Sequence, residues 1–157
     1  MKQKIFDILD SLDINYTNYE HIPVYSCNDA KWVDIPWKRV KSILIRNKKW
    51  TNFYMVVLWE DKRLDTNLIR AVFDDSKMSF VDEEQMIEKI WLRPWSVSPF
   101  ALINNIERDI KVVFEQNFKD ILIWFHPLQN DNTVVLNMAD TERFLESLWV
   151  EFVYAGL

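Results

Sequence analysis

Glycine is nearly absent from this chain of 157 residues, which has one glycine and eight tryptophans. Average usage predicts glycine at about 7%, or roughly 11 residues in a chain of this length. Glycine normally occupies turns that need a positive φ angle or a close approach of the backbone. Either the chain builds its turns from other residues, or the scarcity of glycine and the excess of tryptophan have a common cause.

Cysteine and histidine are also scarce. The single cysteine, Cys27, excludes an internal disulfide and favours a reducing compartment, so we expect a cytoplasmic protein. Neither Cys27 nor the two histidines, His21 and His126, has the spacing of metal ligands. We therefore expect neither a metal nor another cofactor.

Long apolar runs are missing too. The longest are Phe53–Trp59 and Ile121–Phe125, whereas a membrane-spanning helix needs about 20 residues. The first residues turn acidic at Asp7 and Asp10, so no signal peptide is expected. A hydrophobic content of 49%, without linkers, repeats or low-complexity segments, predicts a single globular domain over residues 1–157.

The net charge of −5 argues against general nucleic-acid binding, but the basic residues are unevenly distributed. The segment from Lys38 to Arg63 holds eight of the 19 basic residues and two of the 24 acidic residues. A local basic face suits a partner with a few phosphates, such as a tRNA end. The alternative is a solvated hairpin rim. The predicted tRNA-binding residues are Lys38, Arg39, Arg46, Lys48 and Lys49.

Apolar periodicity predicts an α+β fold, with a mixed, mostly antiparallel sheet flanked by helices. Helices are expected at Lys2–Leu12, Ser26–Ala30, Asp65–Phe73, Asp82–Ile90 and Ala139–Leu148. Strands are expected at Tyr16–His21, Val40–Asn47, Phe53–Leu58, Met78–Val81, Ile110–Glu115, Asp120–Phe125, Thr133–Leu136 and Phe152–Tyr154. The two prolines within Trp91–Phe100 predict an ordered loop.

Five segments together resemble the YbaK/prolyl-tRNA editing family in order and spacing over nearly the whole chain. They are Val40–Lys49, Val56–Asp65, Ser96–Asn105, Phe125–Thr133 and the helix around Arg143–Leu145. The resemblance implies the YbaK-like fold and an aminoacyl-tRNA deacylase. The Ser98-Pro99-Phe100 and Phe125-His126-Pro127-Leu128 pieces are similar to the branch of single-domain proteins that clears alanyl-tRNA for proline.

Lys41 is the residue on which the resembling family depends. Hydrolysis of an aminoacyl ester needs a positioned water, stabilisation of oxyanion charge and a hold on the tRNA 3′ end. A lysine near the start of a strand offers a compact cation for a phosphate or ester oxygen. Without the resemblance, Lys41 reads as a solvated strand residue.

The resemblance also implies a substrate-binding set. His126 would line the amino-acid pocket and limit the size of the side chain admitted, although a hydrogen-bonded structural histidine is the alternative. Backbone N–H groups of the loop would face the substrate carbonyl. The set comprises Trp95, Ser96, Val97, Ser98, Pro99, Phe100, His126 and Asn130. The expected partners are the tRNA acceptor end and prolyl-tRNA synthetase, and the expected state is a monomer.

All eight tryptophans fall where the resembling family has or commonly has glycine. They are Trp32, Trp37, Trp50, Trp59, Trp91, Trp95, Trp124 and Trp149. Some bacterial lineages read the UGA codon as glycine, and others read it as tryptophan. We hypothesise that most of these positions are UGA codons meant as glycine. The alternative is a divergent member with genuine tryptophans.

The tryptophan at position 95 leaves two functions open. With glycine there, the chain resembles an active editing enzyme without departure at this loop. An indole beside the substrate loop favours the alternative, a catalytically weak or inactive tRNA-binding module in which exposed aromatic rings stack on bases.

Overall fold

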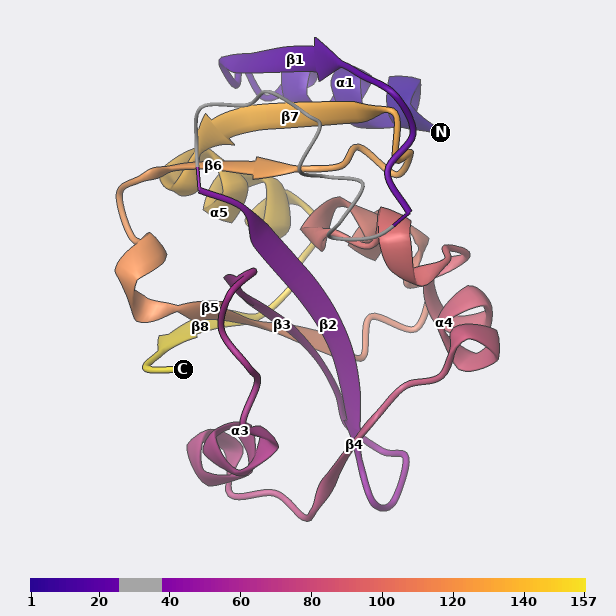
Figure 1. Ribbon diagram of the computed structural model, residues 1–157, viewed down its shortest axis with the longest axis vertical. Helices are drawn as coiled ribbons and strands as arrows, with labels where there is room; N and C mark the ends of the chain where they lie inside the picture. The colour runs from indigo at the N-terminus through magenta and orange to yellow at the C-terminus, as the bar shows by residue number, and fades with distance from the viewer. Residues whose placement is uncertain (26–37) are drawn as a thin grey trace.

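The computed structural model describes residues 1–25 and 38–157 (Figure 1). Several features named above lie outside these ranges, namely the predicted helix Ser26–Ala30, Cys27, Trp32 and Trp37.

Each helix and strand predicted within the described residues is present, with ends that differ by one or two residues. The α-helices are α1 (Lys2–Ser11), α3 (Thr66–Phe73), α4 (Glu83–Ile90) and α5 (Met138–Ser147). The strands are β1 (Tyr16–Glu20), β2 (Val40–Asn47), β3 (Phe53–Trp59), β4 (Met78–Phe80), β5 (Ile110–Glu115), β6 (Leu122–Phe125), β7 (Asn132–Asn137) and β8 (Phe152–Ala155). The 3₁₀ helices are η1 (Pro94–Ser96), η2 (Pro99–Asn104) and η3 (Gln116–Phe118). No helix of the described residues is long and apolar enough to cross a membrane.

The strands form two sheets. The larger has the order β4-β2-β3-β5-β8, and the smaller has the order β1-β7-β6. The pairs β3–β5 and β5–β8 are parallel, and the remaining pairs are antiparallel. The α+β prediction is confirmed. The predicted mixed sheet is divided in two, and β2 runs from beside the smaller sheet across the larger one (Figure 1).

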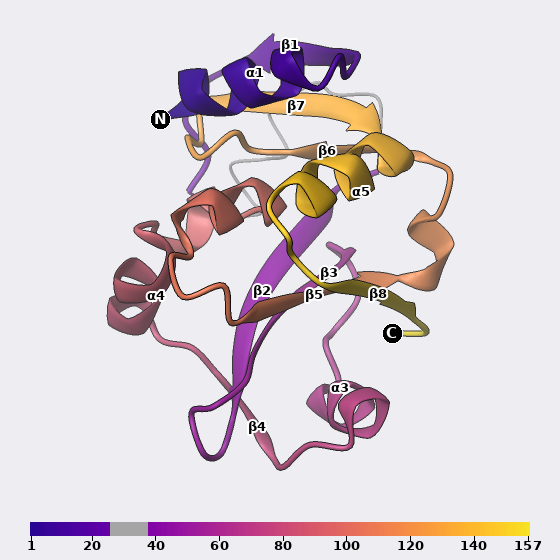
Figure 2. The same ribbon diagram turned by 180° about the vertical axis from the view of Figure 1, so that it is seen from behind.

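The larger sheet is covered on both faces. One face shares its core with the smaller sheet and with α1 and α5, which lie in front of the smaller sheet in Figure 2. The other face packs on α3, whose Ile69 is fully buried. β3 lies between them, and its residues Phe53–Leu58 are all buried, which explains its nearly continuous apolar sequence.

The β2–β3 hairpin carries the first part of the site. Its register pairs Lys41 with Leu58 and Arg46 with Phe53. At the hairpin end, the Asn47 side-chain oxygen accepts hydrogen bonds from the backbone N–H groups of Thr51 and Asn52, at 2.9 and 3.1 Å. The turn therefore holds the register from its closed end.

Asp75 ties this turn to the segment before β4. Its carboxylate accepts hydrogen bonds from Tyr54 (2.6 Å), Asn52 (3.0 Å) and Asn47 (3.1 Å). Partial burial disfavours the charged carboxylate. The hydrogen bonds, from Tyr54 first and also from the Ser76 N–H, outweigh this cost and lower the pKa of Asp75 to about 2.

Loss of this carboxylate should destabilise the fold in a pH-dependent way. We expect Asp75→Ala to reduce the free energy of unfolding at pH 7 by about 1–3 kcal/mol. A lowered pKa stabilises the folded state above the ordinary value of 3.8, and this contribution disappears as the pH falls through about 2. Urea unfolding of parent and variant between pH 2 and 7 measures the difference.

Tyr54→Phe is the matched variant, because it removes one donor and keeps the carboxylate. It should raise the pKa of Asp75 and lose part of the stability. Parallel pH profiles for the parent and Asp75→Ala would contradict the assignment.

Candidate functional site

A cavity of about 270 Å³ opens where β2 begins, between the two sheets. Its walls come from four stretches and one further residue. They are residues 24–25 after β1, residues 40–42 of β2, residues 94–98 around η1 (Ser96 excepted), residues 124–126 at the end of β6, and Glu60.

Lys41 lies on this wall as a cation without an acidic partner. Its basic neighbours are paired, since Arg39 Nε lies 3.0 Å from Glu60 Oε2 and Lys38 Nζ lies 3.5 Å from Asp61. Among the described residues, no carboxylate forms an ion pair with Lys41. Its charge is therefore available to a ligand in the cavity.

The predicted substrate loop contributes Val97 and Ser98 to the wall. The N–H groups of Ser96 and Val97 are used within the η1 turn, where they donate to Arg93 O and Pro94 O at 3.0 and 3.4 Å. Within the described residues, no acceptor takes the backbone N–H of Ser98. That N–H is thus one donor of this loop that remains for a substrate oxygen.

His126 completes the wall opposite the start of β2. Its Nδ1 lies 2.8 Å from the Asn132 carbonyl oxygen and must donate to it. Burial lowers the pKa of His126, and the positive charge of His21 lowers it further, against the Asn132 hydrogen bond. His126 is therefore neutral at pH 7, with its Nε2 lone pair as an acceptor.

Hydrogen bonds lock the loop and the histidine together. Ser98 Oγ donates to the His126 carbonyl oxygen at 2.7 Å, and Ser98 is 1% exposed. The Trp124 indole N–H donates to Lys38 O at 2.9 Å and so joins β6 to the start of β2. The walls of the cavity are cross-linked before any ligand enters.

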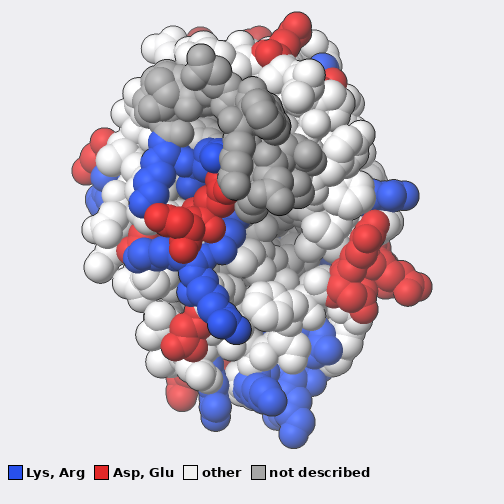
Figure 3. Space-filling model, in the orientation of Figure 1, with Lys and Arg blue, Asp and Glu red and all other residues white. Residues whose placement is uncertain are grey.

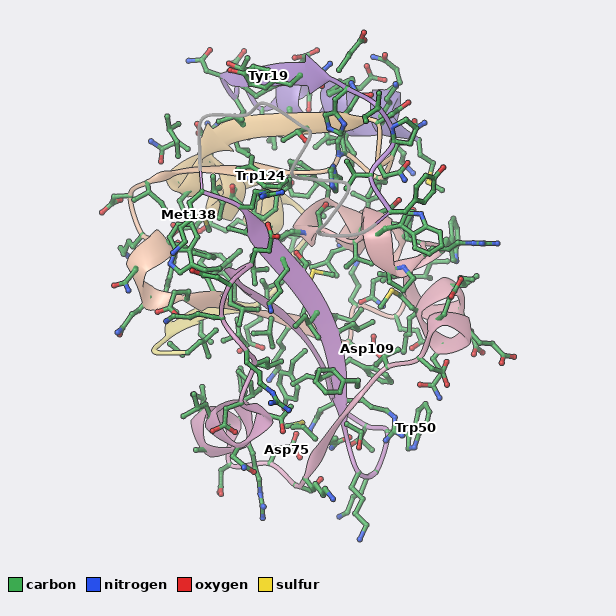
Figure 4. The ribbon with its side chains drawn as sticks, viewed as in Figure 1. Tyr19, Trp50, Asp75, Asp109, Trp124 and Met138 are labelled. Carbon is green, nitrogen blue, oxygen red and sulfur yellow. The ribbon has the colours of Figure 1, made fainter. Side chains whose placement is uncertain are left out.

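The mouth of the cavity is aromatic. The Trp95 and Tyr25 rings meet edge to face with centroids 5.6 Å apart, and Arg93 lies 5.8 Å from the Trp95 ring. The Trp124 ring lies 5.9 Å from the His126 ring (Figure 4 labels Trp124). The cavity persists with both indoles in its wall.

The predicted substrate set separates into wall residues and supporting residues. Trp95, Val97, Ser98 and His126 line the cavity with Lys41. The supporting residues contact the walls or the core instead. Ser96 and Pro99 are buried outside the lining, Phe100 meets Phe125 and Phe144 edge to face in the core, and Asn130 Nδ2 donates to Val24 O at 2.8 Å.

Sequence reasoning missed eight residues of the wall. Five of them lie within two residues of a predicted site residue in the chain, namely Val40, Ser42, Pro94, Trp124 and Phe125. The other three are Val24, Tyr25 and Glu60. Val24 and Tyr25 reach it because Val24 exchanges hydrogen bonds with Asn130, a long-range contact without a local signal. Glu60 reaches it because the turn after β3 lies beside the start of β2. The opposite charges of Arg39 and Glu60, at the two open ends of the predicted hairpin, were the sequence signal for their pairing.

The predicted tRNA-binding residues occupy two places. Lys38 and Arg39 lie beside the cavity, whereas Lys48 and Lys49 lie at the hairpin turn, about 23 Å away along β2. Arg46 lies near that turn, with its guanidinium 3.5 Å from the Trp50 ring (Figure 4). Figure 3 shows basic side chains gathered in two separate places on this face.

The family model for the aminoacyl-tRNA editing domain matches residues 30–144. The chain is 32% identical over 149 residues to the prolyl-tRNA editing protein ProX of Acetoanaerobium sticklandii, covering 93% of this chain and 91% of that protein. It is 23% identical to the prolyl-tRNA synthetase associated domain-containing protein 1 of Danio rerio, covering 93% and 82%.

Solved structures share the fold. A proposed trans-editing enzyme for prolyl-tRNA synthetase matches with a TM-score of 0.70 at 10% identity, covering 99% of this chain and 96% of that one. A hypothetical protein matches with a TM-score of 0.74 at 14% identity, covering 95% and 96%.

The protonation state of His126 can be measured directly. We expect its ring resonances in NMR to titrate with a midpoint below the ordinary histidine pKa of 6.5, because burial penalises the imidazolium. The unfolded chain then binds more protons than the folded chain, so stability falls as the pH drops below 6.5. Asn132 contributes its backbone carbonyl, so a substitution of Asn132 would not remove this hydrogen bond. His126→Gln is therefore the informative variant. It should remove this titration, and a His126 midpoint above 6.5 in the parent would refute the neutral state.

Proposed function

The chain belongs to the family of aminoacyl-tRNA editing domains and is an aminoacyl-tRNA deacylase, and we propose that its substrate is alanine wrongly attached to tRNA for proline. The observation that carries this proposal is one cavity lined by Lys41, Ser98 and the neutral His126, in which the Lys41 ammonium and the Ser98 N–H have no partner among the described residues. The ProX relative is named for prolyl-tRNA editing, which supports tRNA for proline as the nucleic acid.

Lys41 and the Ser98 N–H divide the electrostatic work. Water attacks the ester carbonyl carbon, and the negative charge that develops on the carbonyl oxygen is stabilised by the Lys41 ammonium group and the Ser98 N–H. The bond between the carbonyl carbon and the ribose oxygen then breaks. The ribose oxygen takes a proton, and free alanine and tRNA leave.

The base that activates the water is assigned to the substrate itself. Glu60, the carboxylate of the wall, is held by Arg39 at 3.0 Å, and burial lowers the pKa of His126, which makes its neutral imidazole a weaker base. The neighbouring ribose hydroxyl of the terminal nucleotide lies next to the ester in any pose. It accepts the proton that the attacking water loses and passes its own proton to the departing ribose oxygen, so the proton count balances without a further side chain.

The remaining walls select the amino acid by size. His126, Trp124 and Trp95 enclose a cavity of about 270 Å³. We propose that these side chains narrow the part of the cavity that receives the amino-acid side chain, so that the methyl group of alanine fits and the proline ring does not, which protects correctly charged tRNA. Mischarged tRNA leaves prolyl-tRNA synthetase, so this enzyme is the expected neighbour in the cytoplasm.

A non-catalytic tRNA-binding module is the second candidate. It is favoured by the Trp95 indole at the cavity mouth, where it contacts Tyr25. The cavity is open beside this indole, and Lys41 is accessible from it. Catalysis therefore remains the preferred function.

Replacement of Lys41 tests the mechanism. We expect Lys41→Ala to lower kcat for alanyl-tRNA deacylation about 100-fold or more, as loss of one oxyanion donor does elsewhere. Lys41→Arg keeps the charge but not its compact shape, so it should recover only part of the rate. Lys4→Ala, an exposed lysine of α1, is the control and should match the parent. Equal deacylation rates for the parent and Lys41→Ala would refute the mechanism.

Trp95→Gly separates the two candidate functions. Removal of the indole widens the cavity mouth, so we expect a higher kcat/KM on alanyl-tRNA and weaker discrimination against prolyl-tRNA. Alanyl-, cysteinyl-, seryl- and prolyl-tRNA are assayed side by side. Failure of both parent and Trp95→Gly to hydrolyse any of them, with tRNA binding retained, would establish the module instead.

A further inference from the structure

A second cavity, of about 760 Å³, shares Lys41 with the first. Its walls are formed by Lys41 and Ile43 of β2, the segment 61–66 that joins β3 to α3, and Phe80 of β4. Alternate residues of a strand face the same side, so Lys41 and Ile43 lie together on the face of the sheet that carries α3. Lys41 therefore stands between the two cavities.

Most charges in this second groove are already paired. Asp61 lies 3.5 Å from Lys38, and Lys62 lies 3.0 Å from the buried Glu115. Asp65 caps α3 through the Asn67 N–H and keeps its negative charge. Within the described residues, Arg63 and Lys41 have no such partner. The charge left for a ligand is positive, which suits phosphate.

The far end of the groove is a bare aromatic ring. Phe80 is 60% exposed, and β4 holds it opposite Ile45 of β2. Ile45 is four residues from Lys41, or about 13 Å along the strand. An exposed ring at that distance from two free cations has the composition of a single-stranded nucleic-acid site.

We propose that this groove binds the single-stranded 3′ end of the tRNA and leads it to the editing cavity. Arg63 contacts a phosphate, Phe80 stacks on a base, and Lys41 meets the terminal nucleotide where the two cavities join. This proposal rests on the proposed function and adds the route of the strand. It assigns the recognition of the 3′ end to the β3–α3 segment rather than to the hairpin turn.

Binding of an RNA hairpin that ends in single-stranded CCA tests the groove. Fluorescence anisotropy over a series of salt concentrations gives affinity and salt dependence. We expect Arg63→Ala to weaken binding and to reduce the slope of log K against log salt by about 0.7, the value for one phosphate contact on a single strand. Phe80→Ala should weaken binding about tenfold with an unchanged slope. Lys77→Ala, an exposed lysine next to β4, is the control and should bind like the parent.

The outcomes separate this proposal from the deacylase function. Weaker binding of the CCA hairpin, with no change for a blunt-ended hairpin, supports the groove. Parent-like binding by the Arg63 and Phe80 variants overturns it, as does a loss confined to Lys48→Ala and Lys49→Ala. Deacylation lost in Lys41→Ala would still support the proposed function in those two cases.

A second inference concerns three exposed tryptophans in the left-handed backbone region. Trp50, Trp91 and Trp149 each have φ of 60°. Side chains with a Cβ are strained there, and Trp lacks the short polar group that helps Asn and Asp. The single Gly156 does not have a positive φ.

Each of the three stands in a turn that demands this conformation. Trp91 follows α4, and its N–H donates to Ile87 O at 2.8 Å. After α5, the Trp149 N–H donates to Glu146 O and the Val150 N–H to Leu145 O, both at 3.0 Å, a helix ending that glycine most often provides. Trp50 closes the β2–β3 turn, with its N–H donating to Asn47 O at 3.2 Å.

The indoles contribute little in return. Trp50, Trp91 and Trp149 are 46%, 53% and 90% exposed. The equivalent residues after α1 and α3 are Asp13 and Asp74, which tolerate a positive φ. By contrast, Trp59 packs on Phe118 and Trp124 is buried, so these rings have structural partners.

We infer that positions 50, 91 and 149 are glycine in the protein that the source cell makes, through UGA codons read as glycine. The inference makes three predictions, which concern the codons of the gene, the residues of the cellular protein and the stability of variants.

Sequencing of the three codons tests the first prediction, and peptide mass spectrometry of the protein from its own cells tests the second. Glycine-containing peptides and UGA codons are expected at the three positions. UGG codons, or tryptophan in the cellular peptides, would overturn the inference.

Variants of the tryptophan-containing protein test the predicted change in stability. Trp→Gly at each position should raise the folded-to-unfolded ratio, roughly fivefold, because the left-handed penalty is removed. Trp→Ala is the matched control, because it also removes the indole but keeps Cβ. Equal effects of Gly and Ala would contradict the strain at these positions.

Discussion

The register of the β2–β3 hairpin is the constraint on which the site depends. With Lys41 opposite Leu58, Lys41 and Ile43 face the α3 side of the sheet, whereas Val40 and Leu44 face the core shared with the smaller sheet. A slip of one residue would exchange these faces and move Lys41 away from the groove on the α3 side. The turn that prevents this slip lies at the other end of the strands, so the hairpin turn matters for catalysis without contacting substrate.

Charge pairing explains why one lysine in a basic segment is distinctive. Arg39 and Lys38 are held by Glu60 and Asp61, so much of the positive charge noticed in the sequence is neutralised locally. Among the described residues that line the cavities, the cations without an ion pair are Lys41 and, in the neighbouring groove, Arg63. A free cation among paired ones interacts selectively with an anionic ligand, whereas an entirely unpaired cluster would attract any polyanion.

The sequence predicted the local elements well because apolar periodicity and turn residues are local signals. It could not predict that β3–β5 and β5–β8 pair in parallel, since these pairings join segments far apart in the chain. The residues of the site divide in the same way between those with a local signal and those brought together by long-range contacts. Lys41 and His126 were found through segment resemblance, whereas Val24 and Asn130 meet across 106 residues, and the separation of Lys48 from Lys38 follows from the length of β2.

Trp50 connects the hairpin constraint to the scarcity of glycine. It occupies the turn that holds the register, in a backbone conformation that strains every residue except glycine and, to a smaller degree, Asn and Asp. Its ring lies against Arg46, an exposed contact that offsets little of this strain. Because the strain falls on the turn, the position of Lys41 is held less firmly with Trp50 than it would be with glycine. The amino acid at position 50 therefore affects the editing site through register, whereas position 95 affects it through the wall of the cavity.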